Sequence, residues 1–153
     1  MESVTLVLPY PISANRYWAS RVVTPRGGRP MAITYVTEYA REYKLQISKI
    51  AQAAGFNQPF PWRVTVRYEL FPARPLDWAK RAARNPIGWD DDVRCIDVGN
   101  AHKVLEDALI GIAYPDDKWI WELSGKRMEP DGEARVVVSI APIRVESPQP
   151  GLI

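Results

Sequence analysis

Short stretches in which apolar residues occupy every second position predict β-strands in several parts of the chain. Such alternation places one set of side chains on one face of a sheet and the intervening set on the other face. It occurs at residues 4–8, 62–70, 119–123 and 134–140, and the turn signal Pro130-Asp131-Gly132 separates the last two. The chain is therefore expected to contain four strands, of which the strand at 62–70 is half-buried.

Two longer segments repeat their apolar residues at helical spacing. The first covers residues 36–54, with Thr34 positioned as a cap and Gly55 as the stop. The second carries a single apolar stripe over residues 101–112, where Gly111 fits the helix stop. Together with the strands, these helices predict the order β-α-β-α-β-β. We expect an α+β fold, in which the helices pack on a mixed sheet.

Length and composition indicate one domain. A chain of 153 residues with 46% hydrophobic residues buries a single core, so we expect a domain at residues 1–141 and a Pro-rich tail at 142–153. No apolar run reaches membrane-spanning length and the start lacks a secretory signal, so we expect a cytoplasmic protein with no membrane partner. The single cysteine, Cys95, excludes an intramolecular disulfide and a cysteine-based zinc cluster, and we interpret it as a structural thiol.

Basic residues are segregated along the chain, although the net formal charge is only +2. No acid occurs in residues 3–37, and a second basic cluster lies in residues 72–96; we interpret both segments as loops. The clusters consist of Arg16, Arg21, Arg26 and Arg29, and of Arg74, Lys80, Arg81 and Arg84. Such clusters neutralise phosphates, and Trp18 or Trp78 would stack on an unpaired base. The competing interpretation is a solvated basic surface with buried tryptophans.

Acidic residues flank the second predicted helix. Asp97 lies just before it, and Asp116 and Asp117 follow it in a turn that leads into a strand. Carboxylates gathered in one place repel one another unless a cation lies among them, and Mg²⁺ takes oxygen ligands of this kind. The competing interpretation is that Asp97 is a helix N-cap and that the other two acids are ordinary turn residues.

Lys103 lies on the same helix, where its charge would suit a phosphodiester. It shares a stripe with Asn100 and Asp107 beside the apolar face, whereas His102 and Glu106 are expected to lie further round, toward solvent. The competing interpretation makes Lys103 and Asp107 an ordinary i, i+4 helix pair.

Two sequence motifs resemble those of a known family. The first, L-P-x-P-x-S-x-N-R-Y, occurs at residues 8–17 after the first strand. The second runs from Asp97 to Lys103 and matches the pattern D-x-D-N-x-x-K except at its second aspartate, and Asp107-Ala108-Leu109 and the acid pair 116–117 come after it. In this order, the motifs resemble the RusA family of Holliday junction resolvases, which are largely of phage and prophage origin. The resemblance covers most of residues 4–140.

The resemblance implies a structure-specific endodeoxyribonuclease that resolves Holliday (four-way) junctions in DNA recombination and repair. The family makes nicks that leave a 5′ phosphate. The resemblance also implies a homodimer that acts on branched DNA. A four-way junction has near two-fold symmetry, so matched nicks call for two sites related by a two-fold axis.

Mg²⁺, or alternatively Mn²⁺, is the expected cofactor. Asp97 and Asp117 are expected to hold the ion, with Asp116 as a further ligand or as a neighbour of the ligands. The bound ion would activate water and stabilise charge on the phosphate. A positioned general acid or base alone contributes about 10² to 10⁴ in rate, far less than enzymes reach on very slow reactions, which favours a metal mechanism.

The resemblance and the spacing together assign roles to the remaining site residues. Lys103 is expected to contact the scissile phosphate, and Asn100 to orient Asp97 or a metal-bound water. Asp107 is expected to hold Lys103 in place. The residues expected to bind DNA are Asn15, Arg16, Arg21, Arg26, Arg29, Arg74, Lys80, Arg81 and Arg84.

One position departs from the family pattern. Gly99 stands where the family has its second aspartate, and the loss of that carboxylate is expected to weaken cation binding. Asp90, Asp91 or Asp92 would compensate if the upstream loop folded back, although an acidic triplet in a loop is more often a solvated turn. Two alternatives stay open: a junction-binding protein with impaired cleavage, and a nuclease for other branched DNA.

Overall fold

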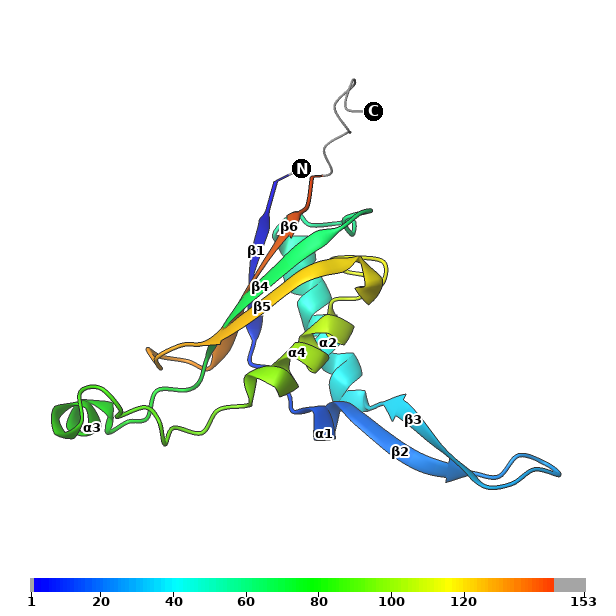
Figure 1. Cartoon of the computed structure of the whole chain (residues 1–153), viewed down its shortest axis with the longest axis horizontal. Helices are drawn as coiled ribbons and strands as arrows, with labels where there is room; N and C mark the ends of the chain where they lie inside the picture. The colour runs from blue at the N-terminus through cyan, green and yellow to red at the C-terminus, as the bar shows by residue number, and fades with distance from the viewer. Residues whose placement is uncertain (1, 145–153) are drawn as a thin grey trace, which may run out of the picture.

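The computed structural model describes residues 2–144, and its centre is a four-stranded sheet (Figure 1). The strand order is β1-β6-β4-β5, with β1 at Val4–Pro9, β4 at Val64–Phe71, β5 at Ile120–Arg127 and β6 at Arg135–Pro142. Strand β6 pairs antiparallel with both β1 and β4, whereas β4 and β5 are parallel. This mixed sheet within a single α+β domain confirms the expected fold class.

Helices cover one face of the sheet. Helix α2, at Glu38–Ala53, contacts β1, and helix α4, at Val98–Ala108, contacts β5. Inward-facing strand residues such as Leu6, Val66 and Val138 join the apolar stripes of both helices in one buried core. The alternate strand positions are exposed or partly exposed, which is why the sequence alternates so clearly along these strands.

The ends of α2 are set by two local signals. Thr37 caps the helix, because its Oγ1 accepts a hydrogen bond from the Ala40 backbone N–H at 3.3 Å. The cap expected from the sequence, Thr34, lies instead in a strand, so that prediction was wrong. Gly55 follows the helix with a φ of 81°, the left-handed conformation that glycine adopts most easily, and the predicted stop is confirmed.

Residues 18–36 form a β-hairpin, and the prediction of a loop there was wrong. Strand β2, at Trp18–Val23, pairs antiparallel with β3, at Met31–Val36. In the connecting turn, Gly28 N donates to Pro25 O at 2.9 Å. The hairpin extends away from the four-stranded sheet (Figure 1). Because only the base of the hairpin, at Trp18 and Val36, packs against the core, its sequence carries no apolar alternation that would mark the strands.

The segment at residues 72–96 contains a short helix, α3 at Trp78–Arg84, where only a loop was expected. None of the α3 residues is buried, so the helix has no apolar stripe by which the sequence would show it. The following turn is held against the end of β5, since Arg127 donates to the carbonyl groups of Asp90 and Val93 at 2.9 and 2.8 Å. The second basic cluster lies on α3 and, at Arg74, just before it.

Two more short elements complete the described chain: α1, at Ala14–Tyr17, and the 3-10 helix η1, at Asp117–Trp119. The expected order β-α-β-α-β-β is recovered by β1, α2, β4, α4, β5 and β6, and the other elements are additions to it.

The Pro-rich segment predicted as a tail begins within the sheet. Strand β6 reaches Pro142, and Ile143 N donates to Arg63 O at 2.9 Å. Residues 145–153 of this segment lie outside the described residues. Among residues 2–144, no helix is long and apolar enough to cross a membrane.

Candidate active site

The first turn of α4 joins the two sequence motifs. Asn100 accepts a hydrogen bond through Oδ1 from the backbone N–H of Ala14 at 2.7 Å, which ties α1 to α4. Asp97 occupies the N-cap position of α4, yet its side chain makes no capping hydrogen bond and is exposed. The capping interpretation therefore does not account for this acid, and its carboxylate is available to a ligand.

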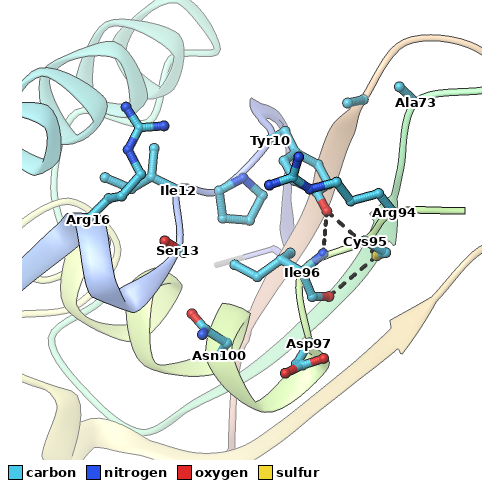
Figure 2. A pocket seen from close by; sticks show the side chains of 12 residues that line it. Tyr10, Ile12, Ser13, Arg16, Ala73, Arg94, Cys95, Ile96, Asp97 and Asn100 are labelled. Atoms are coloured by element: carbon cyan, nitrogen blue, oxygen red, sulfur yellow. Dashed lines mark hydrogen bonds between the residues drawn. The ribbon is translucent and has the colours of Figure 1, made fainter.

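Asp97 lies on the wall of a pocket of about 570 Å³ (Figure 2). One side of the pocket is the connection from β1 to α1, and another is the segment that enters α4. The two sides are joined by a hydrogen bond from Ile96 N to the hydroxyl of Tyr10 at 2.6 Å. Arg16 and Arg94 bring two positive charges to this pocket. Sequence reasoning missed Arg94, although its position three residues before Asp97 was an available signal.

Asp107 is held by a tyrosine. The hydroxyl of the buried Tyr17 donates to Asp107 Oδ2 at 2.6 Å. Burial first, and then this carboxylate, raise the pKa of Tyr17, so the proton stays on the tyrosine. Within the described residues, Lys103 forms no ion pair with Asp107, and its side chain is exposed. The ammonium group of Lys103 is therefore available to a ligand.

A group of acids gathers at the C-terminal end of α4. Burial and then the charge of Asp117 raise the pKa of Glu106. A hydrogen bond with Asp116, followed by burial and the charges of Asp116 and Asp107, raises the pKa of Asp117. The pKa of Asp116 is lowered by that same hydrogen bond and by the backbone N–H of Lys118, which lies 3.2 Å from Asp116 Oδ1. These opposite shifts show like charges crowded together, an arrangement that a cation would relieve.

Two helix residues expected to face solvent are partly buried, because one lies against Tyr68 of β4 and the other beside Asp117. His102 packs edge-on against Tyr68, with ring centroids 4.9 Å apart, and burial lowers its pKa. Its Nε2 has no hydrogen-bond partner within residues 2–144. Glu106 lies beside Asp117, and sequence reasoning missed it. The available signal was the short connection at 109–115, which must return the chain to the last turn of α4.

The acids at the two ends of α4 are not brought together. Asp97 and Asp107 are ten residues apart, which corresponds to about 15 Å along a helix, and Asp117 lies at the Asp107 end. In the part of the chain that the structure describes, no three His, Cys, Asp or Glu side chains converge as a metal site. The donors are of the right chemical type, but their arrangement does not fit an ion shared by Asp97 and Asp117.

Gly99 faces open space on α4. A Cβ atom built at this position meets nothing within 4 Å, and the φ of Gly99 is not in the left-handed region. A side chain would therefore be accommodated here. Asp90 is partly buried, and Asp91 and Asp92 are exposed, in the turn that Arg127 holds.

The two basic clusters lie on projecting elements. Arg21, Arg26 and Arg29 lie on the hairpin, Lys80, Arg81 and Arg84 lie on α3, and Arg74 precedes α3. All of these side chains are exposed except Arg81, which is partly buried and pairs with Asp77 at 2.9 Å. Figure 1 shows the hairpin and α3 extending to opposite sides of α1 and the start of α4. A polyanion lying across the pocket would therefore meet basic residues on both sides.

The other residues considered for DNA contact differ in accessibility. Asn15, in α1, is exposed. Trp18 is partly buried, with its ring 4.4 Å from that of Tyr17. Trp78 is 38% exposed, and the Arg74 guanidinium lies 4.4 Å from its ring centroid. Of the two tryptophans, Trp78 is the better placed to meet a base.

Comparison with known proteins agrees with the sequence motifs. The family profile described as Endodeoxyribonuclease RusA matches residues 9–141, a range that includes α1, the pocket and α4 with the acids at both of its ends. No curated protein sequence matches the chain significantly. Because the family profile matches well over half of the 153 residues, the chain belongs to the RusA family of endodeoxyribonucleases.

Proposed function

We propose that this protein is a structure-specific endodeoxyribonuclease that resolves four-way DNA junctions by paired nicks. The observation that carries the proposal is the hydrogen bond between Asn100 and Ala14. It joins the two family motifs so that the acid Asp97 shares one pocket with Arg16 and Arg94. A pocket with two cations and a carboxylate can hold a phosphodiester beside a group that acts on it.

Asp97, Lys103 and Asp117 are proposed to carry the cleavage. The exposed ammonium group of Lys103 would stabilise charge on the phosphate as it develops. Asn100 is fixed through Oδ1, so its amide hydrogens remain to orient the carboxylate of Asp97 or a bound water. Asp107 is proposed to keep Lys103 in place by charge attraction.

Mg²⁺, or Mn²⁺, is proposed as the cofactor, with Asp97 as a ligand at one end of α4 and Asp116 and Asp117 as ligands at the other, since the described residues do not place the two ends around one ion. The gathering of Asp116 and Asp117 with Glu106 and Asp107 supports a cation at the end of α4, because a cation relieves repulsion among like charges. Hard divalent ions also prefer carboxylate oxygens. Because Asp97 lies at the other end of the helix in this structure, we assign no coordination geometry to these residues.

A homodimer is proposed as the acting unit, because matched nicks in a two-fold symmetric junction call for two symmetric sites. Trp62 and Trp121 are candidates for the contact surface, since 43% and 59% of their surfaces are exposed. The Arg63 guanidinium lies 3.7 Å from the Trp121 ring centroid. Trp119 is a weaker candidate, because it is partly buried against the core.

A nicking assay tests the proposed function. With Mg²⁺ or Mn²⁺, the protein should nick opposing strands of a four-way junction, leave 5′ phosphates and spare a linear duplex of the same sequence, and a chelator should stop the reaction. Sedimentation at micromolar concentration should give about twice the chain mass of 17.4 kDa. Equal nicking of flaps and junctions would favour the nuclease for other branched DNA. Junction binding without nicking would favour the binding protein with impaired cleavage.

Gly99→Asp is expected to raise the nicking rate about tenfold or more and to lower the Mg²⁺ concentration that is required. An added carboxylate strengthens a hard-cation site, and even groups that only support metal ligands contribute about 10- to 100-fold. The space at Gly99 is open, and an acid in the first turn interacts favourably with the helix dipole. Mg²⁺ titration of the nicking rate measures the effect.

Gly99→Asn is the matched control, because asparagine has the size of aspartate without its charge. An equal gain from both variants would assign the effect to helix stability and not to cation binding. If Asp90, Asp91 or Asp92 already supplies the missing carboxylate, Gly99→Asp should give no gain, and alanine at the substituting acid should abolish nicking.

A further inference from the structure

We infer that the pocket beside Asp97 receives one unpaired nucleotide of the bound DNA, with its phosphate between Arg16 and Arg94. The inference rests on the proposed function and adds a place where the branch itself is recognised. The pocket lies between the connection from β1 to α1 and the segment that enters α4 (Figure 2).

The size of the pocket fits a single nucleotide and not a duplex. Its volume of about 570 Å³ lies within the range of roughly 300–1,000 Å³ that is typical of small-molecule sites. The major groove of B-DNA alone is about 12 Å wide, so a whole duplex cannot enter a hollow of this volume. A base that enters the pocket must therefore have left its stack.

The charged groups of the pocket are separated in space. In Figure 2, the guanidinium groups of Arg16 and Arg94 lie on the side away from the carboxylate of Asp97. Among the described residues, neither arginine pairs with an acid. The Arg16 guanidinium lies 4.8 Å from the centroid of the Tyr39 ring, and a phosphate at the arginine side would lie near both positive charges and apart from the Asp97 charge.

The walls between these charges are mainly apolar. Ile12 and Ile96, which are partly exposed, offer surface against which a base or a deoxyribose can pack. The hydroxyl of Ser13 and the amide of Asn100 line the same pocket and can hydrogen-bond to the polar edge of a base. A nucleotide has this same division into a charged phosphate, an apolar sugar and ring face, and a polar base edge.

The shape of the pocket is held by hydrogen bonds that need no ligand. Ile96 N donates to the Tyr10 hydroxyl at 2.6 Å, and Ala14 N donates to Asn100 at 2.7 Å. Burial raises the pKa of Tyr10 to about 12, so its hydroxyl stays protonated at neutral pH and can donate to Cys95 Sγ, 3.6 Å away. A preformed pocket lowers the entropy lost when a ligand binds.

Such a pocket would distinguish branched DNA from a duplex. Removing a base from an intact stack costs more free energy than removing one that is already unpaired or poorly stacked. Stacking is interrupted where the strands of a junction exchange. The nucleotide beside the exchange point would therefore enter the pocket most readily, and linear duplex would bind mainly through the basic clusters.

Cys95 gives a direct measurement, because it lines the pocket and is the only cysteine of the chain. The rate of its modification by a maleimide is measured for the full chain without added metal, alone and with saturating junction or duplex. The junction should slow the modification about tenfold or more, and the duplex should slow it much less. A gel shift under the same conditions reports binding separately.

Arg94→Gln should weaken junction binding about tenfold and lower the slope of log affinity against log salt by about 0.9, the value for one phosphate contact. It should affect duplex binding less. Arg67→Gln is the matched control, because Arg67 is an exposed arginine of β4 that lies on the face of the strand opposite to the buried side chains. Equal losses of junction affinity in the two variants would show that Arg94 makes no specific contact with the junction.

A second reporter separates direct contact from a change of shape. A junction whose base beside the exchange point carries a tether ending in a mixed disulfide should form a disulfide with Cys95 by thiol–disulfide exchange, with release of the small leaving thiol, and the same base in a duplex should not. If Cys95 reacts too slowly in the free protein, Ala73→Cys in a Cys95→Ser chain reports from an exposed residue of the same pocket.

The outcomes distinguish the pocket from the overall function. The nucleotide pocket is overturned if a junction binds in the gel shift but protects neither Cys95 nor the cysteine of the Ala73→Cys variant and forms no crosslink. The proposed function then stays intact. A protein that binds no junction at all overturns the proposed function itself.

Discussion

Asp97→Asn and Asp117→Asn are each expected to lower the rate of junction nicking by at least about 100-fold and to leave junction binding unchanged. Loss of a group that merely supports a metal ligand costs about 10- to 100-fold, so loss of a carboxylate that acts directly should cost more. Both side chains are exposed, and that of Asp97 makes no capping hydrogen bond, so its replacement removes no such contact from the fold. Single-turnover nicking and metal-free gel shifts measure the two quantities separately.

Glu69→Gln is the matched control for these substitutions. Glu69 is an exposed acid of β4 on the face of the sheet opposite to the core, and its charge should not affect nicking. Undiminished nicking in both aspartate variants would show that the acids at the two ends of α4 do not belong to the active site. A parallel loss of binding would instead assign them to the structure of the DNA-binding surface.

Gly125→Ala is expected to destabilise the protein by about 3 kcal/mol, since overpacking a core costs roughly 1–3 kcal/mol and a lost hydrogen bond about 1 kcal/mol more. A Cβ at this position of β5 would overlap the ring of Tyr68, which is only 2% exposed. The Tyr68 hydroxyl donates to Val98 O at 2.8 Å and so supports the first turn of α4. The melting temperature should fall by roughly 10 °C, and thermal unfolding measures it.

Gly99→Ala is the control for the effect of a methyl group at a glycine. Nothing lies within 4 Å of that position, and alanine is favoured over glycine in a helix by up to about 1 kcal/mol. This variant should therefore be slightly more stable than the natural chain. If Gly125→Ala melted at the same temperature as Gly99→Ala, the contact between Tyr68 and β5 would be shown to adjust at little cost.

The strands and the two large helices were predictable because one face of each packs on the common core. Burial on one side forces the apolar period that the sequence displays, such as the alternation along β4 and the stripe along α4. The β2–β3 hairpin and α3 were missed for the converse reason. Neither is anchored by a fully buried apolar face, so no periodic signal was available.

The site was predictable as a set of motifs but not as a geometry. Spacing predicted that Asn100, Lys103 and Asp107 share one flank of α4, and in the structure Asn100 and Asp107 both contact α1, through Ala14 and Tyr17. The spacing did not show that Tyr17 would hold Asp107 through a hydrogen bond of 2.6 Å, across 90 residues of sequence. Nor did it show Arg94 in the pocket, because its role depends on how the segment before α4 returns to α1.

The sequence by itself determined the elements with a buried face, the single core and the family, because these follow from local periodicity and from motifs read in order. Only the tertiary structure decided which charged groups meet. It placed Asp97 with Arg16 and Arg94 at one end of α4, and Asp117 with Glu106 at the other. The physical reason is that such contacts join residues far apart in the chain, and their distances depend on how complete elements pack, which no local pattern records.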